Sequence, residues 1–146
     1  MMTDRELAQA LRAAALLAGD FTLRSGRRSK YYLDKYLFET QPALLRELGR
    51  RFARYVTPAV DRVAGAELGA IALAAATSLE TGKPFVIVRN AKKAGYGTGK
   101  LIEGKLERGE RVLLVTAQDK EGHVASVQLG AFVVLAPSGG SIPAAL

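Results

Sequence analysis

The chain has 146 residues, 49% of them apolar and 24% charged, which suits one domain with one hydrophobic core. It has no cysteine, which excludes disulfide bonds, thiolate metal sites and a cysteine nucleophile. The formal net charge of +7 is uneven, because residues 112–146 hold only one lysine against two acidic residues. The positive charge of residues 1–111 favours an anionic partner such as a phosphorylated small molecule or nucleic acid. An arginine-rich surface that is only solvated explains the charge equally well.

The N-terminal residues carry acidic side chains within an amphipathic pattern and predict a helix, not the apolar core of a signal peptide. Nowhere does an apolar run approach the roughly 20 residues that a membrane-spanning helix needs. We therefore expect a cytoplasmic protein with no membrane partner.

The first 58 residues predict two helices separated by a β-hairpin. Thr3 and Glu6 have the spacing of a capping box, and Gly19 is a typical helix-ending residue. A basic turn with serine and glycine between two short apolar runs is typical of a hairpin. In chain order the predicted elements are a helix over 3–19, strands over 21–23 and 31–33 around a turn at 25–29, and a helix over 40–55.

In the rest of the chain, buried strands alternate with a helix, which predicts an α/β fold with a parallel sheet of the doubly wound type. The strands are short apolar runs, and the helix is alanine-rich and ends at Gly82. The predicted elements are strands over 61–65, 84–88, 112–115 and 131–135, a helix over 67–80, and a long loop over 89–104.

The segment GDFTLRSGRRSKYYLDKY, residues 19–36, is one candidate binding motif. Arg24 lies beside the hairpin turn, and Tyr31 and Tyr32 follow on the second strand. An arginine fork binds phosphate or carboxylate through two hydrogen bonds, and an aromatic ring packs on a flat ligand. Taken alone, this motif is better explained by an exposed basic turn with one core tyrosine.

The segment VRNAKKAGYGTGKLIEG, residues 88–104, is the second candidate. A buried strand delivers Arg89 at its end, and Lys92, Lys93 and Tyr96 follow among three glycines. Lysines supply positive charge to a polyphosphate, and glycines let the backbone approach a ligand. Because parallel α/β sheets bind ligands at the carboxyl ends of their strands, this position favours a binding loop over a solvated surface loop.

Three segments together resemble the orotate phosphoribosyltransferases, which are type I phosphoribosyltransferases. The segments are GDFTLRSGRRSKYYLD, AGAELGAIALAAATSLETGKPFVIVRN and GYGTGKLIEGKLERGERVLLV, in this order within about residues 5–115. The resemblance implies an α/β fold with a parallel-sheet phosphoribosyltransferase-like core, an N-terminal helix and β-hairpin hood, and missing C-terminal strands. We expect one domain over 1–146, with the hood and helices at 1–58, the core at 59–115 and a divergent segment at 116–146.

The same resemblance implies a reaction. Orotate and 5-phosphoribosyl 1-diphosphate would give orotidine 5′-phosphate and diphosphate, a step of pyrimidine and UMP biosynthesis. It also implies Mg²⁺ as a cofactor and a homodimer in which a loop of one subunit completes the active site of the other.

The resemblance also implies roles for individual residues by their position. Arg89 and Lys93 match catalytic residues of the loop, and Tyr31 and Tyr32 match an aromatic pair beside the orotate ring. No residue is assigned as a metal ligand. Lysine and arginine side chains over the departing diphosphate would stabilise an oxocarbenium-like transition state. The residues implied to bind the phosphoribosyl diphosphate are Arg24, Arg89, Lys92, Lys93 and Tyr96.

The sequence departs from the family pattern after the strand at 112–115. The family has two acidic residues that hold the ribose hydroxyls, followed by a loop rich in Thr, Gly and Ser that wraps the 5′-phosphate. Thr116 and Ala117 occupy the acidic positions here, and Gly122 is the one glycine nearby. Asn90 stands where many members have a second basic residue. The loop matches the family with one inserted residue between Lys93 and Tyr96, whereas a gapless alignment anchored on Tyr96 would displace Arg89 and Lys93 from the positions they match.

Three interpretations therefore compete. The chain is a working but divergent orotate phosphoribosyltransferase, a catalytically inactive relative that binds a nucleotide or nucleic acid through its basic surface, or a truncated or frame-shifted product. The change of charge near residue 112 favours the third, although short apolar C-termini are common. Orotate and 5-phosphoribosyl 1-diphosphate are the expected partners, and nucleic acid is the less favoured one.

Overall fold

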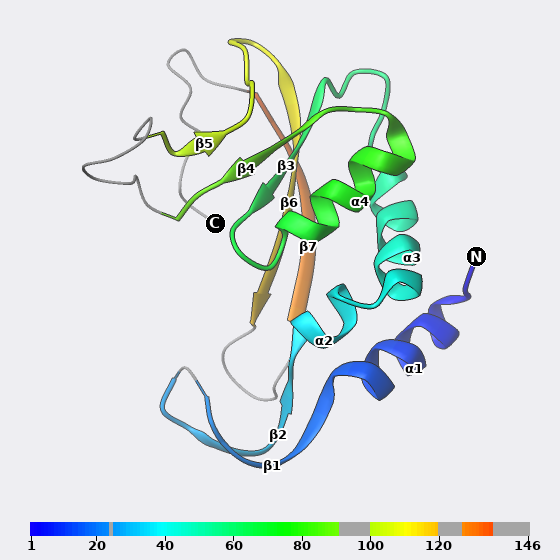
Figure 1. Ribbon diagram of the computed structural model, residues 1–146, viewed down its shortest axis with the longest axis vertical. Helices are drawn as coiled ribbons and strands as arrows, with labels where there is room; N and C mark the ends of the chain where they lie inside the picture. The colour runs from blue at the N-terminus through cyan, green and yellow to red at the C-terminus, as the bar shows by residue number, and fades with distance from the viewer. Residues whose placement is uncertain (24, 91–99, 120–126, 136–146) are drawn as a thin grey trace.

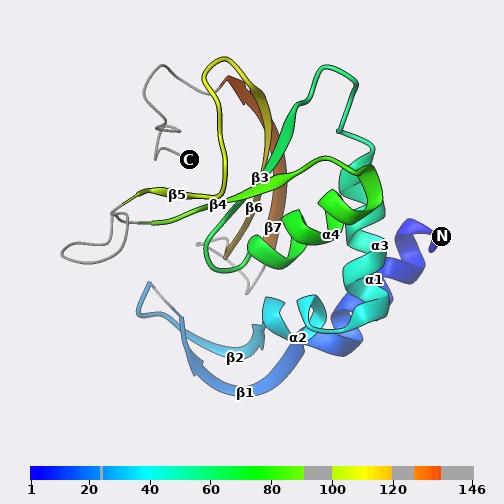
Figure 2. The ribbon, with the colours of Figure 1, turned by 45° about the horizontal axis from the view of Figure 1, so that its top comes forward.

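The computed structural model describes residues 1–23, 25–90, 100–119 and 127–135, and for residues 118, 119 and 127–135 it describes the backbone alone. Its two sheets are a two-stranded hairpin and a five-stranded sheet. The hairpin lies beyond one end of the larger sheet, and the first helix lies to the side of the sheet with the other helices (Figures 1 and 2). No helix within the described ranges is long and apolar enough to cross a lipid bilayer.

Helix α1 (Asp4–Ala15) begins with the predicted capping box. The Glu6 backbone N–H donates to the Thr3 hydroxyl over 3.2 Å, and the Thr3 backbone N–H donates to the Glu6 carboxylate over 2.7 Å. These two bonds satisfy donors that the first helical turn would otherwise leave unpaired.

The predicted end of this helix at Gly19 is wrong. Strand β1 (Leu16–Thr22) starts directly after Ala15 and pairs antiparallel with β2 (Arg28–Leu33), with Leu16 opposite Leu33. The hairpin hydrogen bonds replace those of a further helical turn. Local propensity does not reveal this competition, because it depends on a partner strand further along the chain.

Two helices follow the hairpin, α2 (Lys35–Glu39) and α3 (Pro42–Ala53). The sequence predicted only α3, which has Pro42 in its first turn as expected. At the start of α2, the Tyr36 backbone N–H donates to the Asp34 carboxylate over 3.0 Å. A five-residue helix contains too few apolar positions to show a helical period, so the prediction missed it.

The central strand of the large sheet is β3 (Arg62–Ala66), which pairs in parallel with β4 (Phe85–Val88) and with β6 (Arg111–Asp119). The outer strands are antiparallel: β5 (Ile102–Glu103) pairs with β4, and β7 (Val127–Leu135) pairs with β6. The strand order is β5-β4-β3-β6-β7. The predicted α/β class is confirmed, and the sheet is parallel in its centre and antiparallel at both edges.

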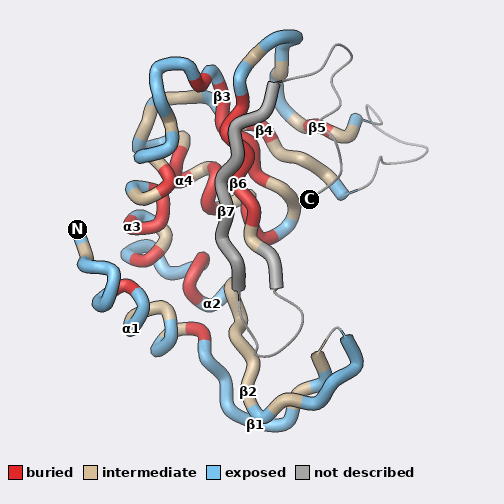
Figure 3. Tube along the Cα trace, turned by 180° about the vertical axis from the view of Figure 1, so that it is seen from behind, coloured by how far each residue is buried: buried red, intermediate tan, exposed pale blue. Residues whose placement is uncertain are grey.

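Helix α4 (Ile71–Thr81) connects β3 to β4, and α3 packs against it. It ends at Gly82 with φ of 71°, as predicted, and it starts four residues later than predicted because residues 67–70 form a turn. The buried residues concentrate in β3, β6, α3 and α4 (Figure 3). The centre of the protein is therefore a sheet face covered by a pair of helices.

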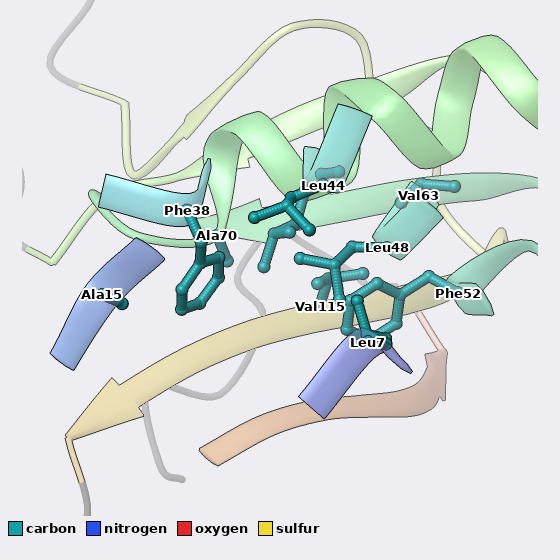
Figure 4. Packing of buried hydrophobic residues seen from close by; sticks show 11 residues of the cluster. Leu7, Ala15, Phe38, Leu44, Leu48, Phe52, Val63, Ala70 and Val115 are labelled. Atoms are coloured by element: carbon teal, nitrogen blue, oxygen red, sulfur yellow. The ribbon is translucent and has the colours of Figure 1, made fainter. Parts of the chain in front are cut away.

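On the face of the sheet that the helices cover, side chains of α3 pack against strand residues. Leu44, Leu48 and Phe52 belong to one cluster with Val63 of β3 and Val115 of β6 (Figure 4). The next residue of β3, Ala64, belongs to a second cluster, since successive strand residues point to opposite faces. Members of this second cluster are Ala64, Val86, Ile102, Val112 and Leu114.

Helices α3 and α4 are in close contact at Gly49. A Cβ atom there would lie 2.9 Å from the Ala76 carbonyl carbon and 2.9 Å from the Ala76 Cβ, which is too close for unstrained packing. The absence of a side chain at Gly49 thus sets the spacing of the helix pair.

We predict that Gly49→Ala lowers the free energy of unfolding by about 1–3 kcal/mol through overpacking, even though alanine is the better helix former by about 1 kcal/mol. Urea denaturation measures the change. The exposed Ala43→Gly on the same helix is the control, and it should lose only the helix-propensity difference. A Gly49→Ala protein more stable than the wild type would contradict the packing described.

Glu39, the last residue of α2, is a buried carboxyl group in this helical layer. Its side chain is 3% exposed, and its Oε1 atom has no hydrogen-bond partner among the described residues. The pKa of Glu39 is raised to about 7, mainly because burial disfavours the charged form; Lys35 lowers it and the Asp34 carboxylate adds a smaller rise. The protonated form of Glu39 is therefore favoured in the folded state.

This raised pKa predicts a stability that falls as pH rises. Between the ordinary glutamate pKa and about 7, the folded state keeps a proton that the unfolded state has lost. Because Glu39→Gln cannot titrate, its advantage over the wild type in the free energy of unfolding should grow by about 3 kcal/mol from acidic pH to about pH 8. Urea denaturation across this range tests it, with the exposed Glu107→Gln as control. Parallel pH profiles for the wild type and Glu39→Gln would refute it.

Candidate functional site

The carboxyl ends of β3 and β4 lie at one edge of the sheet because the two strands are parallel. The turn at residues 67–70, called here the β3–α4 loop, begins with Glu67, whose backbone N–H donates to the Val88 carbonyl over 2.8 Å. The loop is thereby tied to the last residue of β4. This edge is where an open α/β sheet binds ligands, so it is the candidate site.

Arg89 and Asn90 leave β4 at this edge. The Arg89 backbone N–H donates to the Leu101 carbonyl over 2.8 Å, and its side-chain Nε donates to Glu103 Oε1 over 2.9 Å. The Asn90 backbone N–H donates to Glu67 Oε1 over 2.5 Å. The structure thus places Arg89 where the sequence predicted it, and adds two carboxylates that the prediction did not include.

Tyr31 and Tyr32 are half-buried on β2. The Tyr32 ring is tilted against the Phe21 ring of β1, with 5.7 Å between the ring centroids. Since successive residues of a strand point to opposite faces, the two tyrosine rings do not share one face of the hairpin. Their predicted contact with orotate stays a prediction.

The other predicted ligand residues, Arg24, Lys92, Lys93 and Tyr96, lie outside the described residues. The alignment of the loop around Lys93 and Tyr96 therefore also stays a prediction.

Lys35 of α2 reaches the β3–α4 loop, and the sequence analysis missed it. A Cβ atom built on Gly69 would lie 2.5 Å from Lys35 Cε and 3.4 Å from the Ala117 Cβ, so the lysine stem packs directly on the glycine backbone. The Lys35 ammonium lies 5.1 Å from the centroid of the Tyr36 ring. Lys35 was missed because α2 itself was not predicted, and the Asp34 cap was the one local signal for it.

Strand β6 continues past the point where the family pattern has its acidic pair. Thr116 is buried and Ala117 is half-buried. Their backbones pair with Gly130 and Leu129 of β7, and the ladder runs on to Asp119 opposite Val127. At residues 116–119 the chain thus extends the sheet instead of turning away to form a phosphate-binding loop.

Comparison with known proteins gives one consistent result. The orotate phosphoribosyltransferase of Methanocella arvoryzae is 51% identical over 113 residues, which cover 77% of this chain and 64% of that protein. The enzyme of the same name from Natronomonas pharaonis is 49% identical over 115 residues, or 78% of this chain and 65% of that protein. No model of a known protein family matches the chain.

Solved structures agree with these sequences. Orotate phosphoribosyltransferase of Mycobacterium tuberculosis H37Rv in complex with Fe(III) dicitrate superposes with a TM-score of 0.62 at 32% identity, covering 75% of this chain and 63% of that one. Its complex with 5-phospho-α-D-ribosyl 1-diphosphate gives a TM-score of 0.53 at 32% identity, covering 75% and 60%.

The chain spans 64% and 65% of the length of the two sequence relatives described. The matched part nevertheless agrees with them in sequence and with the solved enzyme in fold. Over about three quarters of its length, this chain is a relative of the orotate phosphoribosyltransferases.

Proposed function

We propose that the chain carries out or takes part in the reaction of its relatives, in which orotate and 5-phosphoribosyl 1-diphosphate give orotidine 5′-phosphate and diphosphate. The observation that supports it most directly is the position of Arg89, which leaves β4 at the carboxyl edge of the sheet. A solved relative was crystallised with 5-phospho-α-D-ribosyl 1-diphosphate, and we extend that ligand to this chain.

In this reaction the bond from the anomeric carbon to the diphosphate oxygen breaks, and a bond from that carbon to an orotate ring nitrogen forms. Negative charge builds on the departing diphosphate while positive charge builds on the ribose ring. Cationic side chains near the diphosphate stabilise this separation of charge. We propose Arg89, Lys92 and Lys93 for this role, with Arg24 and Tyr96 binding the same ligand and Tyr31 and Tyr32 lying beside orotate.

A second copy of the chain is the partner we propose for the hairpin. Strand β1 exposes Leu16 and Leu17, and α2 exposes Tyr36 and Leu37, with 37–40% of each residue accessible. Apolar residues exposed on neighbouring segments are typical of an interface. The proposed homodimer would cover them, and a cytoplasmic location is proposed with it.

Mg²⁺ is not matched by the described residues. They contain no group of three or more acidic or histidine side chains that could hold a metal ion. The two carboxylates at the edge, Glu67 and Glu103, already accept hydrogen bonds from Asn90 and Arg89. The described residues therefore do not fit a protein-bound Mg²⁺, and we derive no step through the ion.

One observation favours a second function, namely binding of a nucleotide or nucleic acid without turnover. Strand β6 extends through Thr116 and Ala117 into the ladder with β7, at the positions where the resemblance implies acidic residues for the ribose hydroxyls. A basic chain without that acidic pair would still attract phosphates.

The enzymatic proposal predicts formation of orotidine 5′-phosphate from orotate and 5-phosphoribosyl 1-diphosphate, measured by the loss of orotate absorbance. Lys93→Ala should lower this rate by about 10²–10³, the scale for loss of one transition-state contact. Lys83→Ala is the matched control, because Lys83 precedes β4 at the opposite edge of the sheet. The enzymatic proposal fails for this chain if wild type and Lys93→Ala are equally inactive.

The binding proposal predicts an affinity for a fluorescently labelled single-stranded RNA that falls steeply between about 50 mM and about 200 mM salt, because phosphate contacts release counterions. Fluorescence anisotropy measures it. An affinity that does not change with salt would rule out binding through the basic surface.

A further inference from the structure

Arg89 and Glu103 form an ion pair whose hydrogen bond uses one nitrogen of the guanidinium. Arg89 Nε donates to Glu103 Oε1 over 2.9 Å. Among the described residues, this is the hydrogen bond made by the Arg89 side chain. Arginine carries further N–H donors on its two terminal nitrogens. A bond through Nε therefore holds the side chain while its terminal nitrogens keep donors for a second partner.

The backbone under this pair is held in place. Strands β4 and β5 pair antiparallel, with Ile87 opposite Glu103 and Val88 opposite Ile102. Ile102 is 6% exposed and packs in the second hydrophobic cluster, with Val88 against that cluster. Since strand residues alternate between faces, Glu103 shares the other face with Ile87 and Arg89. Arg89 and Glu103 are thus diagonal neighbours on a short ladder whose opposite face is anchored in the core.

The residue after Arg89 is held as well. The Asn90 backbone N–H donates to Glu67 Oε1 over 2.5 Å, and the Glu67 backbone N–H donates to the Val88 carbonyl over 2.8 Å. Carboxylates from the β3–α4 loop and from β5 thus hold the two residues that leave β4. The direction in which the backbone leaves β4 is therefore defined, and so is the position of the Arg89 backbone.

Stability is a poor explanation for this ion pair. The side chains of Arg89 and Glu103 are 21% and 40% exposed, and partly exposed ion pairs add little to folding. The negative charge of Glu103 beside Arg89 would also disfavour the binding of an anion there. A carboxylate at this position therefore needs another role. Holding the guanidinium in one orientation is such a role.

We propose that Glu103 is a positioning residue that holds Arg89 through Nε and so leaves its terminal nitrogens to bind a diphosphate group. The ligand named here rests on the proposed function. Pre-organised side chains lose less conformational entropy on binding, so the held arginine binds the anion more tightly than a loose one.

The test compares full-length variants for binding of inorganic diphosphate by isothermal titration calorimetry. Glu103→Gln should weaken binding about three- to tenfold and Glu103→Ala at least about tenfold, on the scale of the coupling between residues that belong to one ion-pair network. Glu107→Gln removes the same charge from a carboxylate that bonds Lys105 over 2.8 Å and not Arg89. This control should leave diphosphate affinity unchanged or slightly higher.

Two further measurements separate positioning from a general structural effect. In an Arg89→Gln background, Glu103→Gln should have no further effect on affinity, because the residue it positions is gone. In ¹⁵N NMR spectra without ligand, the Arg89 Nε–H signal should exchange slowly with water in the wild type and rapidly in Glu103→Ala.

The outcomes distinguish the two proposals. If the wild type binds no diphosphate, the proposed function fails together with the ligand named here. If the wild type binds diphosphate and Glu103→Gln binds it equally or more tightly, the positioning role alone is overturned. An Arg89 Nε–H signal that exchanges equally fast in wild type and Glu103→Ala also overturns it, whether or not diphosphate binds.

Discussion

The parallel pairing of β3 with both β4 and β6 is the constraint on which the other features depend. It joins segments 62–66, 85–88 and 112–115, which are far apart in the chain, through the burial of their apolar side chains. Because β3 and β4 run the same way, the residues that follow them meet at one edge. Glu67 contacts Val88 and Asn90 there for this reason, and not because of any local sequence preference.

Close packing behind the sheet keeps this edge in place. A Cβ atom at Gly65 would lie 2.6 Å from the Ala70 carbonyl oxygen, so the absence of a side chain lets α4 start directly against β3. Gly49 allows the same closeness between α3 and α4, and the small residues of α4 continue it. The absence of a side chain at Gly65 therefore lets the β3–α4 loop lie close to the end of β3.

The edge combines cations with carboxylates. Arg89 is bonded to Glu103, Asn90 to Glu67, and Lys35 crosses from α2 to pack on Gly69. On the far side of β3, Thr116 and Ala117 extend β6 where the resemblance implied an acidic pair. At the β4 end of this edge, the described residues include Arg89 at the position expected for it, whereas at β6 a continued strand stands where the resemblance implied acidic residues.

Sequence patterns alone were enough to predict several features. They are the buried strands, the helices α1 and α3, the capping box at Thr3, the helix end at Gly82 and the position of Arg89 at a strand end. These features follow from short-range periodicity and capping chemistry, which act within a few residues. The end of α1 at Ala15 and the antiparallel outer strands follow from the three-dimensional fold, because each depends on a partner strand further along the chain. Helix α2 was missed because it is too short to show a helical period. The bonds of Arg89 to Glu103 and of Asn90 to Glu67 join residues 14 and 23 positions apart. Such contacts form only after the strands have paired, so no local pattern in the sequence specifies them.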